Sequence, residues 1–256
     1  MERITRQTLS KVPAVTVFFW ITKILTTGMG ETTSDWLVVH FVPEVGVAIA
    51  GIGLAVAFVL QFSAKRYLPW IYWFAVVMVS IFGTMAADVL HVVLGVPYVV
   101  STIFFTVVLA IIFIIWYAFE KILSIHSITS TRREFFYWAT VLATFALGTA
   151  AGDMTAIVFH LGYFTSGVLF AIVFAIPAIG YFWFGLNEIL AFWFAYIVTR
   201  PLGASFADWM GVSIARGGLA WGTGPVSLAL AILIFGLVGY LALTHLDVEK
   251  RKKRTI

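Results

Sequence analysis

The stretch FWITKILTTGMGETTSD at residues 19–35 decides the fold, because its spacing of Trp20, Gly30 and Asp35 returns along the chain. The later copies of tryptophan, glycine and aspartate are Trp73, Gly83 and Asp88, then Trp138, Gly148 and Asp153, then Trp193, Gly203 and Asp208. An aromatic residue precedes the tryptophan in every copy. With only 10 tryptophans in 256 residues, chance does not explain the pattern. It indicates a fourfold internal repeat, in which each copy is one structural unit.

The composition places these repeats in a membrane. Hydrophobic residues make up 62% of the chain and charged residues 11%, whereas soluble domains carry about 25% charged residues. Apolar runs of about 20 residues, long enough to cross a bilayer, follow one another along the sequence. These continuous runs disfavour a β-barrel, whose strands alternate in polarity. The chain has no cysteine, which excludes disulfides and thiolate metal sites.

The apolar runs predict an all-α polytopic membrane protein with eight transmembrane helices, two in each repeat. The expected spans cover about residues 12–40, 45–63, 69–94, 98–119, 135–158, 164–185, 187–210 and 225–244. They group into repeats at about 12–66, 67–126, 132–186 and 187–246, within a single transmembrane domain. Residues 247–256 are expected to form a basic cytoplasmic tail.

The basic residues predict the orientation. Nearly all of them lie at the chain ends or in loops on one side of the membrane, and the loops on the other side carry Arg216. By the positive-inside rule both termini are cytoplasmic, so the net charge of +4 reports orientation and not nucleic-acid binding. Two spans per repeat make the four copies parallel, with a symmetry axis along the membrane normal. Nearly all intramembrane polar residues lie in the odd-numbered spans, so we expect these inside and the even-numbered spans facing lipid.

The repeated aspartates are the main functional signal. Each lies about 20 residues into its span, roughly 30 Å along a helix, which places it in the outer half of the membrane. Glu31 stands four residues before Asp35 on the same helix face. Thr84 and Thr149 take the corresponding place in the next two repeats, so we expect their hydroxyls beside the aspartates.

A shared cation site is the interpretation that we favour for these acids. Oxygen ligands suit hard cations, and an added imidazole shifts the preference towards Mn, Zn, Fe or Co. The expected metal-binding residues are Glu31, Asp35, Asp88, His91, Asp153 and Asp208. The alternative is structural, with each aspartate capping a backbone or anchoring its span at the membrane surface.

Lys23 and Arg200 are basic residues deep within the first and seventh spans. A lone cation there is costly, so we expect each of them to have an ion-pair partner. Two roles stay open for them: gating or charge balance for the acids, and permanent structural salt bridges.

The glycines and tryptophans of the motif receive structural roles. We expect the four glycines to permit close approach of helices, as small residues do in membrane bundles. The tryptophans lie in the cytoplasmic third of their spans. They suit an aromatic belt at the membrane surface or, alternatively, a collar that closes the inner end of a path.

The four copies resemble a bacterial family of integral membrane proteins built from a four-times-repeated unit of unknown function. The element Glu31-Thr32-x-x-Asp35 is the most recognisable part of the resemblance, which covers almost the whole chain. The other copies keep the glycine and the aspartate, but the glutamate becomes threonine, threonine and alanine. The resemblance implies residence in the bacterial inner membrane and carries no activity with it.

These observations predict a secondary transporter or exporter of a cation coupled to protons, with a divalent metal ion favoured over a monovalent one. Protonation of clustered carboxylates would provide the coupling, since such acids cannot all stay ionised at close range. The absence of a P-loop motif argues against an ATP-driven pump. The expected partners are membrane lipid, the cation and protons, without nucleic acid, and a homo-oligomer is left open.

Two other functions are weighed against the transporter. The first is a channel or permease for a small polar or cationic solute, with aromatic residues lining the path. The second is a membrane-embedded metalloenzyme, with His91, His160 and the acids holding the metal and Glu31 as base. No HExxH pattern supports an enzyme. We therefore expect a protein that is not an enzyme and that has no cofactor besides the metal ion.

Overall fold

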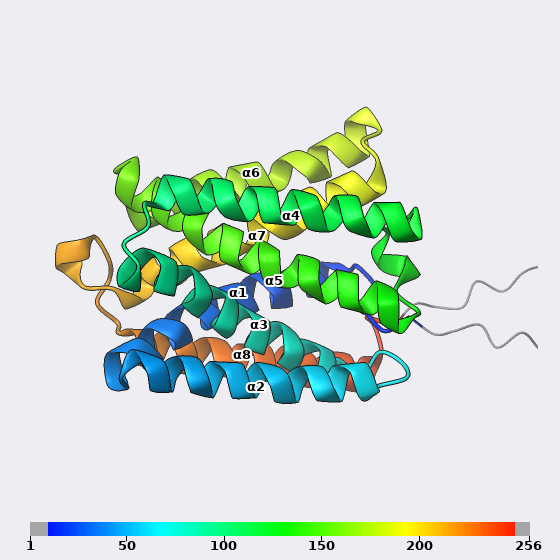
Figure 1. Cartoon of the computed structure of the whole chain (residues 1–256), viewed down its shortest axis with the longest axis horizontal. Helices are drawn as coiled ribbons and strands as arrows, with labels where there is room; N and C mark the ends of the chain where they lie inside the picture. The colour runs from blue at the N-terminus through cyan, green and yellow to red at the C-terminus, as the bar shows by residue number, and fades with distance from the viewer. Residues whose placement is uncertain (1–9, 249–256) are drawn as a thin grey trace, which may run out of the picture.

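The computed structural model describes residues 10–248, and this part of the chain holds eight long helices and no strand (Figure 1). The helices are α1 (Val17–His40), α2 (Pro43–Ser63), α3 (Pro69–Asp88), α4 (Tyr98–Glu120), α5 (Thr131–Asp153), α6 (Gly162–Phe184), α7 (Glu188–Gly211) and α8 (Thr223–Thr244). Two π-helical turns, η1 (Val89–Val93) and η3 (Met154–Val158), directly follow α3 and α5. Short 3₁₀ turns form η2 (Ile125–Ser127) and η4 (Ile214–Arg216). The predicted all-helical fold is confirmed.

Side-chain caps set where several helices begin. The Thr16 hydroxyl accepts a hydrogen bond from the Phe19 backbone N–H at 3.3 Å, at the start of α1. The predicted start of the first span near Val12 is therefore wrong, since the helix begins only after this cap, at Val17. The side chain of Asn187 caps α7 in the same way, so this helix begins at Glu188, next to the predicted start of the seventh span.

The four odd-numbered helices pack against one another in a closed ring, in the order α1, α3, α5, α7 and back to α1. The motif glycines permit this packing, because a methyl group added at any of them would collide with the next helix in the ring. The residues met are Ser80 for Gly30, Phe145 for Gly83, Arg200 for Gly148 and Thr27 for Gly203. The same glycine therefore sets the same helix contact in all four repeats.

The even-numbered helices pack on the outside of this ring, α2 on α3, α4 on α5, α6 on α7 and α8 on α1. Between 56% and 72% of the span positions of α3, α5 and α7 are buried, against 11% to 28% for the outer helices. Large apolar side chains such as Phe182 and Leu243 stay exposed on the outer helices. The ring is thus enclosed by a layer of helices with apolar outer faces.

Seven helices in the described part of the chain are long and apolar enough to cross a membrane, and α1 is the exception. With 24 residues α1 is long enough, but Lys23, Glu31 and Asp35 lower its hydropathy. Lys23 and Glu31 are buried inside the ring, so their polar groups do not face outward. These helices are those of a membrane protein.

Where the ring helices begin, the aromatic pairs of the four repeats form a closed collar. The first aromatic residue of each repeat contacts the tryptophan of a neighbouring repeat, with ring centroids 5.5 to 6.1 Å apart. The pairs are Phe19 with Trp73, Tyr72 with Trp138, Tyr137 with Trp193 and Phe192 with Trp20. Trp73, Trp138 and Trp193 are buried, so the aromatic-belt role is wrong for these three, and the collar is the arrangement observed.

The two described ends of the chain meet beyond the collar. Lys11 Nζ lies 2.6 Å from a carboxylate oxygen of Glu134, and Gln61 donates to the other oxygen at 2.8 Å. The Tyr67 hydroxyl donates to Asp247, whose backbone carbonyl also accepts from an N–H of the N-terminal segment at 2.8 Å. Burial raises the pKa of the Asp247 carboxyl and the pKa of the Tyr67 hydroxyl. Buried polar contacts therefore close this end of the molecule.

Candidate functional site

Acidic side chains from all four ring helices meet towards the ends opposite the collar. One oxygen each of Glu31, Asp153 and Asp208 lies within 4.8 Å of the other two. Asp88, Asp153 and one ring nitrogen of His91 also lie within 4.8 Å of one another. Because Asp153 belongs to both groups, five of the six residues predicted to bind metal form one continuous cluster.

The sixth predicted residue, Asp35, belongs to neither group. It lies one helical turn beyond Glu31 and is close enough to interact electrostatically with Asp88, Asp153 and Asp208. Asp208 is only 6% exposed, and no hydrogen bond or ion pair reaches its carboxylate within residues 10–248. A buried carboxylate without a donor is costly unless a proton or a cation binds it. Asp208 is therefore the acid for which a bound proton or cation would be most stabilising.

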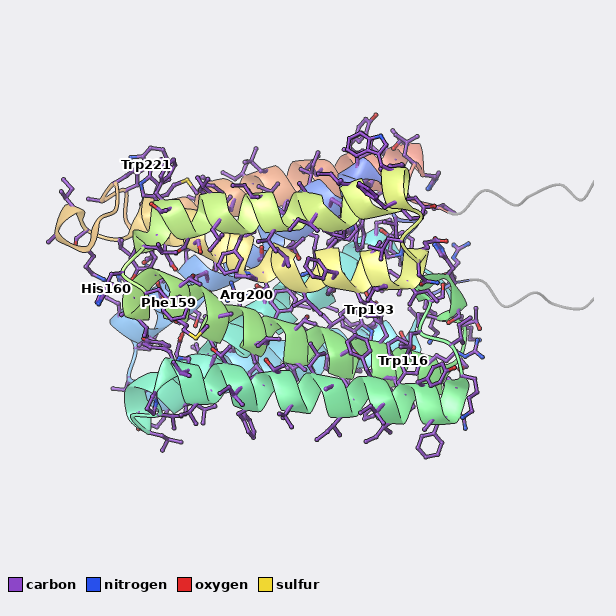
Figure 2. All side chains as sticks on the ribbon, turned by 90° about the horizontal axis from the view of Figure 1, so that it is seen from above. Trp116, Phe159, His160, Trp193, Arg200 and Trp221 are labelled. Atoms are coloured by element: carbon purple, nitrogen blue, oxygen red, sulfur yellow. The ribbon has the colours of Figure 1, made fainter. Side chains whose placement is uncertain are left out.

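A fully buried guanidinium closes the cluster on the collar side. Arg200 forms an ion pair with Glu31, and the same nitrogen donates to the Thr84 hydroxyl and, at 2.7 Å, to the Thr149 hydroxyl. Its other terminal nitrogen donates to the Thr27 carbonyl at 3.3 Å. Figure 2 shows Arg200 midway along the molecule. Arg200 thus has an ion-pair partner, as predicted, and the structure identifies this partner as Glu31. The arginine of one repeat binds side chains of the other three.

The two threonines therefore have a different role from the one that we expected. Thr84 and Thr149 do occupy the place four residues before an aspartate, but their hydroxyls bind Arg200. Thr84 also donates to Glu31 at 3.3 Å. The prediction that these hydroxyls lie beside the aspartates is corrected, since they form a layer with the arginine one helical turn nearer the collar.

Lys23 lies between the arginine layer and the collar and is fully buried. Its Nζ atom is 4.0 Å from the centroid of the Phe145 ring and 4.2 Å from that of Tyr196. No acceptor in the described chain lies within hydrogen-bond distance of this nitrogen. The prediction of an ion-pair partner is wrong for Lys23, because two aromatic faces occupy the place where a carboxylate was expected.

Two of the four motif aspartates are followed directly by π-helical turns. η1 follows Asp88 and η3 follows Asp153, whereas α1 and α7 continue as α-helices past Asp35 and Asp208. π-Helical turns occur frequently at functional sites. η1 contains His91, so this local change of helix type accompanies the imidazole that joins the cluster.

Several polar residues at this end lie outside the sequence prediction. Ser101 Oγ is 2.5 Å from His91 Nε2, and Arg216 donates to the Tyr163 hydroxyl at 2.7 Å. The signal for Ser101 was its position as a polar residue near the start of an otherwise apolar run. His160, the other histidine weighed as a ligand, is exposed at the end of the molecule and joins neither group (Figure 2).

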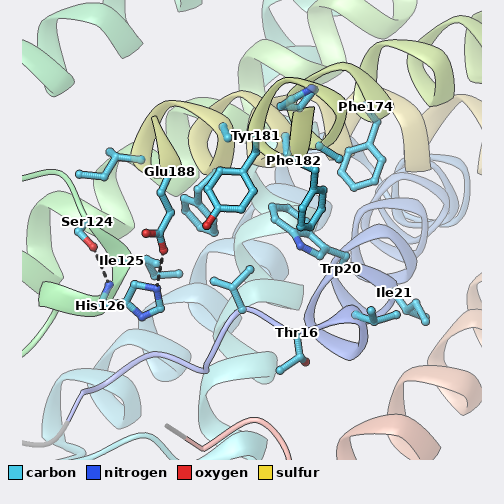
Figure 3. Close-up of a pocket in the computed structure, with 18 of the residues that line it drawn as sticks. Thr16, Trp20, Ile21, Ser124, Ile125, His126, Phe174, Tyr181, Phe182 and Glu188 are labelled. Atoms are coloured by element: carbon cyan, nitrogen blue, oxygen red, sulfur yellow. Dashed lines mark hydrogen bonds and ion pairs between the residues drawn. The ribbon is translucent and has the colours of Figure 1, made fainter. Parts of the chain in front are cut away.

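A cavity of about 820 Å³ lies between α1, α6 and α7, beside the collar (Figure 3). Its lining is largely apolar and includes Trp20, Phe174 and Pro177. An ion pair between His126 and Glu188, at 3.4 Å, stands at one edge. None of the clustered acids lines this cavity, so it does not belong to the candidate site.

The cluster carries an excess of negative charge when its acids are ionised. Its carboxylates are those of Glu31, Asp88, Asp153 and Asp208, and the cation in direct contact with the cluster is Arg200, which pairs with Glu31. Ionised groups inside a membrane pair with counter-charges because solvation by lipid is poor. The arrangement is suited to bind cations or protons.

The fourfold pattern also appears in a comparison with known protein families. The profile of a family described as Repeat of Unknown Function (DUF347) matches residues 18–67, 71–121, 136–186 and 191–246. These four matches each cover one pair of successive long helices and together span most of the chain. No curated protein and no solved structure matches the chain. The chain belongs to the Repeat of Unknown Function family (DUF347).

Proposed function

We propose that this protein is a secondary transporter that moves a divalent metal cation across the bacterial inner membrane in exchange for protons. The observation that carries the proposal is the convergence of Glu31, Asp153 and Asp208, with Asp88 beside them, inside a ring of apolar helices. Carboxylates from separate repeats have no packing reason to gather in a membrane interior, where each is costly. A charged substrate that binds at their meeting point accounts for the arrangement.

In the proposed topology, all eight helices span the membrane and the four repeats are parallel about an axis along the membrane normal. The burial of Lys23 and Glu31 supports α1 as an inner span, and the apolar outer surfaces of the even-numbered helices support contact with lipid. Lys65, Arg66 and Lys121 support a cytoplasmic collar end. The basic residues of segments 1–9 and 249–256, which we also predict to be cytoplasmic, lie outside the described residues.

Coupling follows from competition for the same oxygen atoms. A carboxylate must lose its proton before it binds a metal ion, so each bound cation displaces protons from the cluster. Arg200 neutralises part of the negative charge of Glu31. The cluster therefore binds the cation less tightly and can release it. The collar blocks a continuous path beneath the cluster, so transport requires the ring helices to move relative to one another.

The test is metal-stimulated proton flux in proteoliposomes, measured with Mn, Zn, Mg, Co and Na. Wild-type protein is expected to move protons when a divalent ion is supplied, and Asp153→Asn is expected to abolish this flux. Glu44→Gln is the matched control, because Glu44 is an exposed acid on α2 that belongs to neither acidic group. Unchanged flux in folded Asp153→Asn would contradict the proposal. Solute flux independent of pH and metal would support a channel, and stoichiometric metal binding without flux would support an enzyme.

A further inference from the structure

We propose that the acidic cluster contains two cation positions in series that share Asp153, and that the outer position uses the imidazole of His91. The outer position consists of Asp88, His91 and Asp153, and the inner position of Glu31, Asp153 and Asp208. This inference rests on the proposed transport of a cation and specifies which class of cation the site accepts.

The hydrogen bonds around His91 leave one ring nitrogen free for a metal. The Ser101 hydroxyl donates to the Tyr98 carbonyl at 3.0 Å, so its oxygen accepts from His91 Nε2–H at 2.5 Å. This network assigns the proton of the neutral imidazole to Nε2. Nδ1 is then a lone-pair donor, and it is buried without a hydrogen-bond partner in the described chain.

This arrangement is the one by which proteins orient a metal-binding histidine. Such histidines donate the second ring N–H to a fixed acceptor, which sets the tautomer and the ring orientation. Tyr98 adds a second constraint, since its ring centroid lies 4.3 Å from that of His91. The N-terminal turn of α4 therefore positions an imidazole on η1 beside two carboxylates.

The two positions differ in burial, which orders them along the path. Asp88, His91 and Asp153 are half-buried, whereas Glu31 and Asp208 are buried. A cation arriving from the end opposite the collar meets the half-buried set first. The inner set offers the Asp208 carboxylate, which has no donor among residues 10–248, and the Glu31 carboxylate, which is shared with Arg200. An ion reaching the inner position must therefore compete with the guanidinium for Glu31.

The ligand atoms define the class of cation. A site with one imidazole nitrogen and two carboxylates favours first-row divalent transition metals over Mg²⁺, Ca²⁺ and Na⁺, which prefer oxygen alone. The inner position contains only oxygen ligands and does not discriminate in this way. Selectivity for ions such as Mn²⁺ is therefore set at the outer position and not by the oxygen ligands of the inner position.

The test uses Mn²⁺ bound to purified full-length protein in detergent, with electron spin echo envelope modulation to detect coordinated nitrogen. Wild-type protein is expected to show nitrogen modulation. Asp208→Asn is expected to keep it, because the outer position stays intact. His91→Gln is expected to lose it while Mn²⁺ still binds at the inner position. His160→Gln is the matched control, since it removes an exposed histidine at the same end.

Ser101→Ala provides a second variant that leaves the imidazole in place. Loss of its hydrogen bond is expected to weaken Mn²⁺ binding to the outer position by roughly tenfold, measured in the Asp208→Asn background. Mn²⁺ bound without nitrogen modulation in both wild type and Asp208→Asn would overturn the inference and leave the proposed transport standing. Complete loss of Mn²⁺ binding in folded Asp208→Asn would likewise refute two separate positions. A wild-type protein that binds no divalent cation would instead overturn the proposed function.

Discussion

The two ends of the helix ring use the same fourfold repeat differently. At the collar, every repeat supplies an aromatic residue and a tryptophan, and each pair makes the same contact with a neighbouring repeat. At the acidic end, the position four residues before the aspartate holds Glu31, Thr84, Thr149 or Ala204. Only the second and third repeats of the described chain continue into π-helical turns. The packing is fourfold symmetric, whereas the four repeats contribute different polar side chains to the acidic end.

The four repeats differ most clearly at the position eight residues before each aspartate. The four residues there are Thr27, Ser80, Phe145 and Arg200. A ring of four arginines at this level would place like charges together at high cost, and a ring with none would leave Glu31 buried without a counter-charge. The single arginine binds side chains from the other three repeats and neutralises the charge of Glu31. The charges of the aspartates are then not balanced by an arginine. A functional centre thus forms on the axis without four identical contributions.

Removing that arginine is expected to give the largest effect. Arg200→Ala leaves Glu31 buried and unpaired, which should lower the free energy of unfolding by about 3–5 kcal/mol. Arg132→Ala is the matched control, because Arg132 pairs with Glu120 at the surface and its removal should change stability little. Equilibrium unfolding in mixed micelles, followed by tryptophan fluorescence, measures both.

A double variant separates charge from packing at this position. Glu31→Gln combined with Arg200→Met removes the carboxylate as well as the guanidinium, so no unpaired charge remains. It should recover part of the stability lost in Arg200→Ala. If Arg200→Ala is as stable as Arg132→Ala, the arginine layer does not hold the ring together.

The sequence repeat was sufficient to predict the close helix contacts and the gathering of most of the acids, but it left the collar open beside an aromatic belt. A fixed spacing of tryptophan, glycine and aspartate places equivalent residues at equivalent heights on parallel helices, so the close helix contacts and the gathering of acids follow from it. The helix boundaries were predicted less well, because a single side chain such as Thr16 shifts the start of α1. Caps act locally and leave little trace in hydrophobic periodicity.

Features that differ between the copies could not be predicted from the repeat. Which carboxylate pairs with Arg200 depends on how far each side chain reaches across the axis, and spacing does not encode that reach. Lys23 shows the same limit, since its contacts with Phe145 and Tyr196 require the register between three helices. The π-helical turn that contains His91 is a backbone irregularity without a compositional signal in the sequence.

The glycine contacts give the second test, with an intermediate effect. Alanine at Gly203 would bring its Cβ within 2.6 Å of the Ile24 carbonyl on α1. Relieving this clash would require the backbone of α1 or α7 to move. We expect Gly203→Ala to lower the free energy of unfolding by about 1–3 kcal/mol. Gly236→Ala on α8 meets no atom within 4 Å and should be neutral or stabilising by about 0.5–1 kcal/mol. Equal stability of the two variants would show that the ring tolerates wider helix spacing.

The smallest expected effect is a pH dependence at the closed end. Burial raises the pKa of Asp247 above its usual 3.8, so the folded chain holds this proton more tightly than the unfolded chain does. The resulting stabilisation is fully present below about pH 4 and is lost as the pH rises through the raised pKa. Asp247→Asn lacks this contribution. The stability of wild type relative to Asp247→Asn should therefore fall from about pH 4 towards neutrality and then stay level.

Tyr67→Phe sharpens this test because the Tyr67 hydroxyl donates to Asp247 and opposes the rise in its pKa. Without that donor the pKa of Asp247 should rise further, and the loss of stability should move to higher pH. The charge of His245 acts in the same direction as the hydroxyl and remains in both proteins. A pH profile that is identical in wild type and Asp247→Asn would mean that the carboxyl is solvated in the folded state. The closed end would then lack the buried Tyr67–Asp247 contact that distinguishes it from the acidic end.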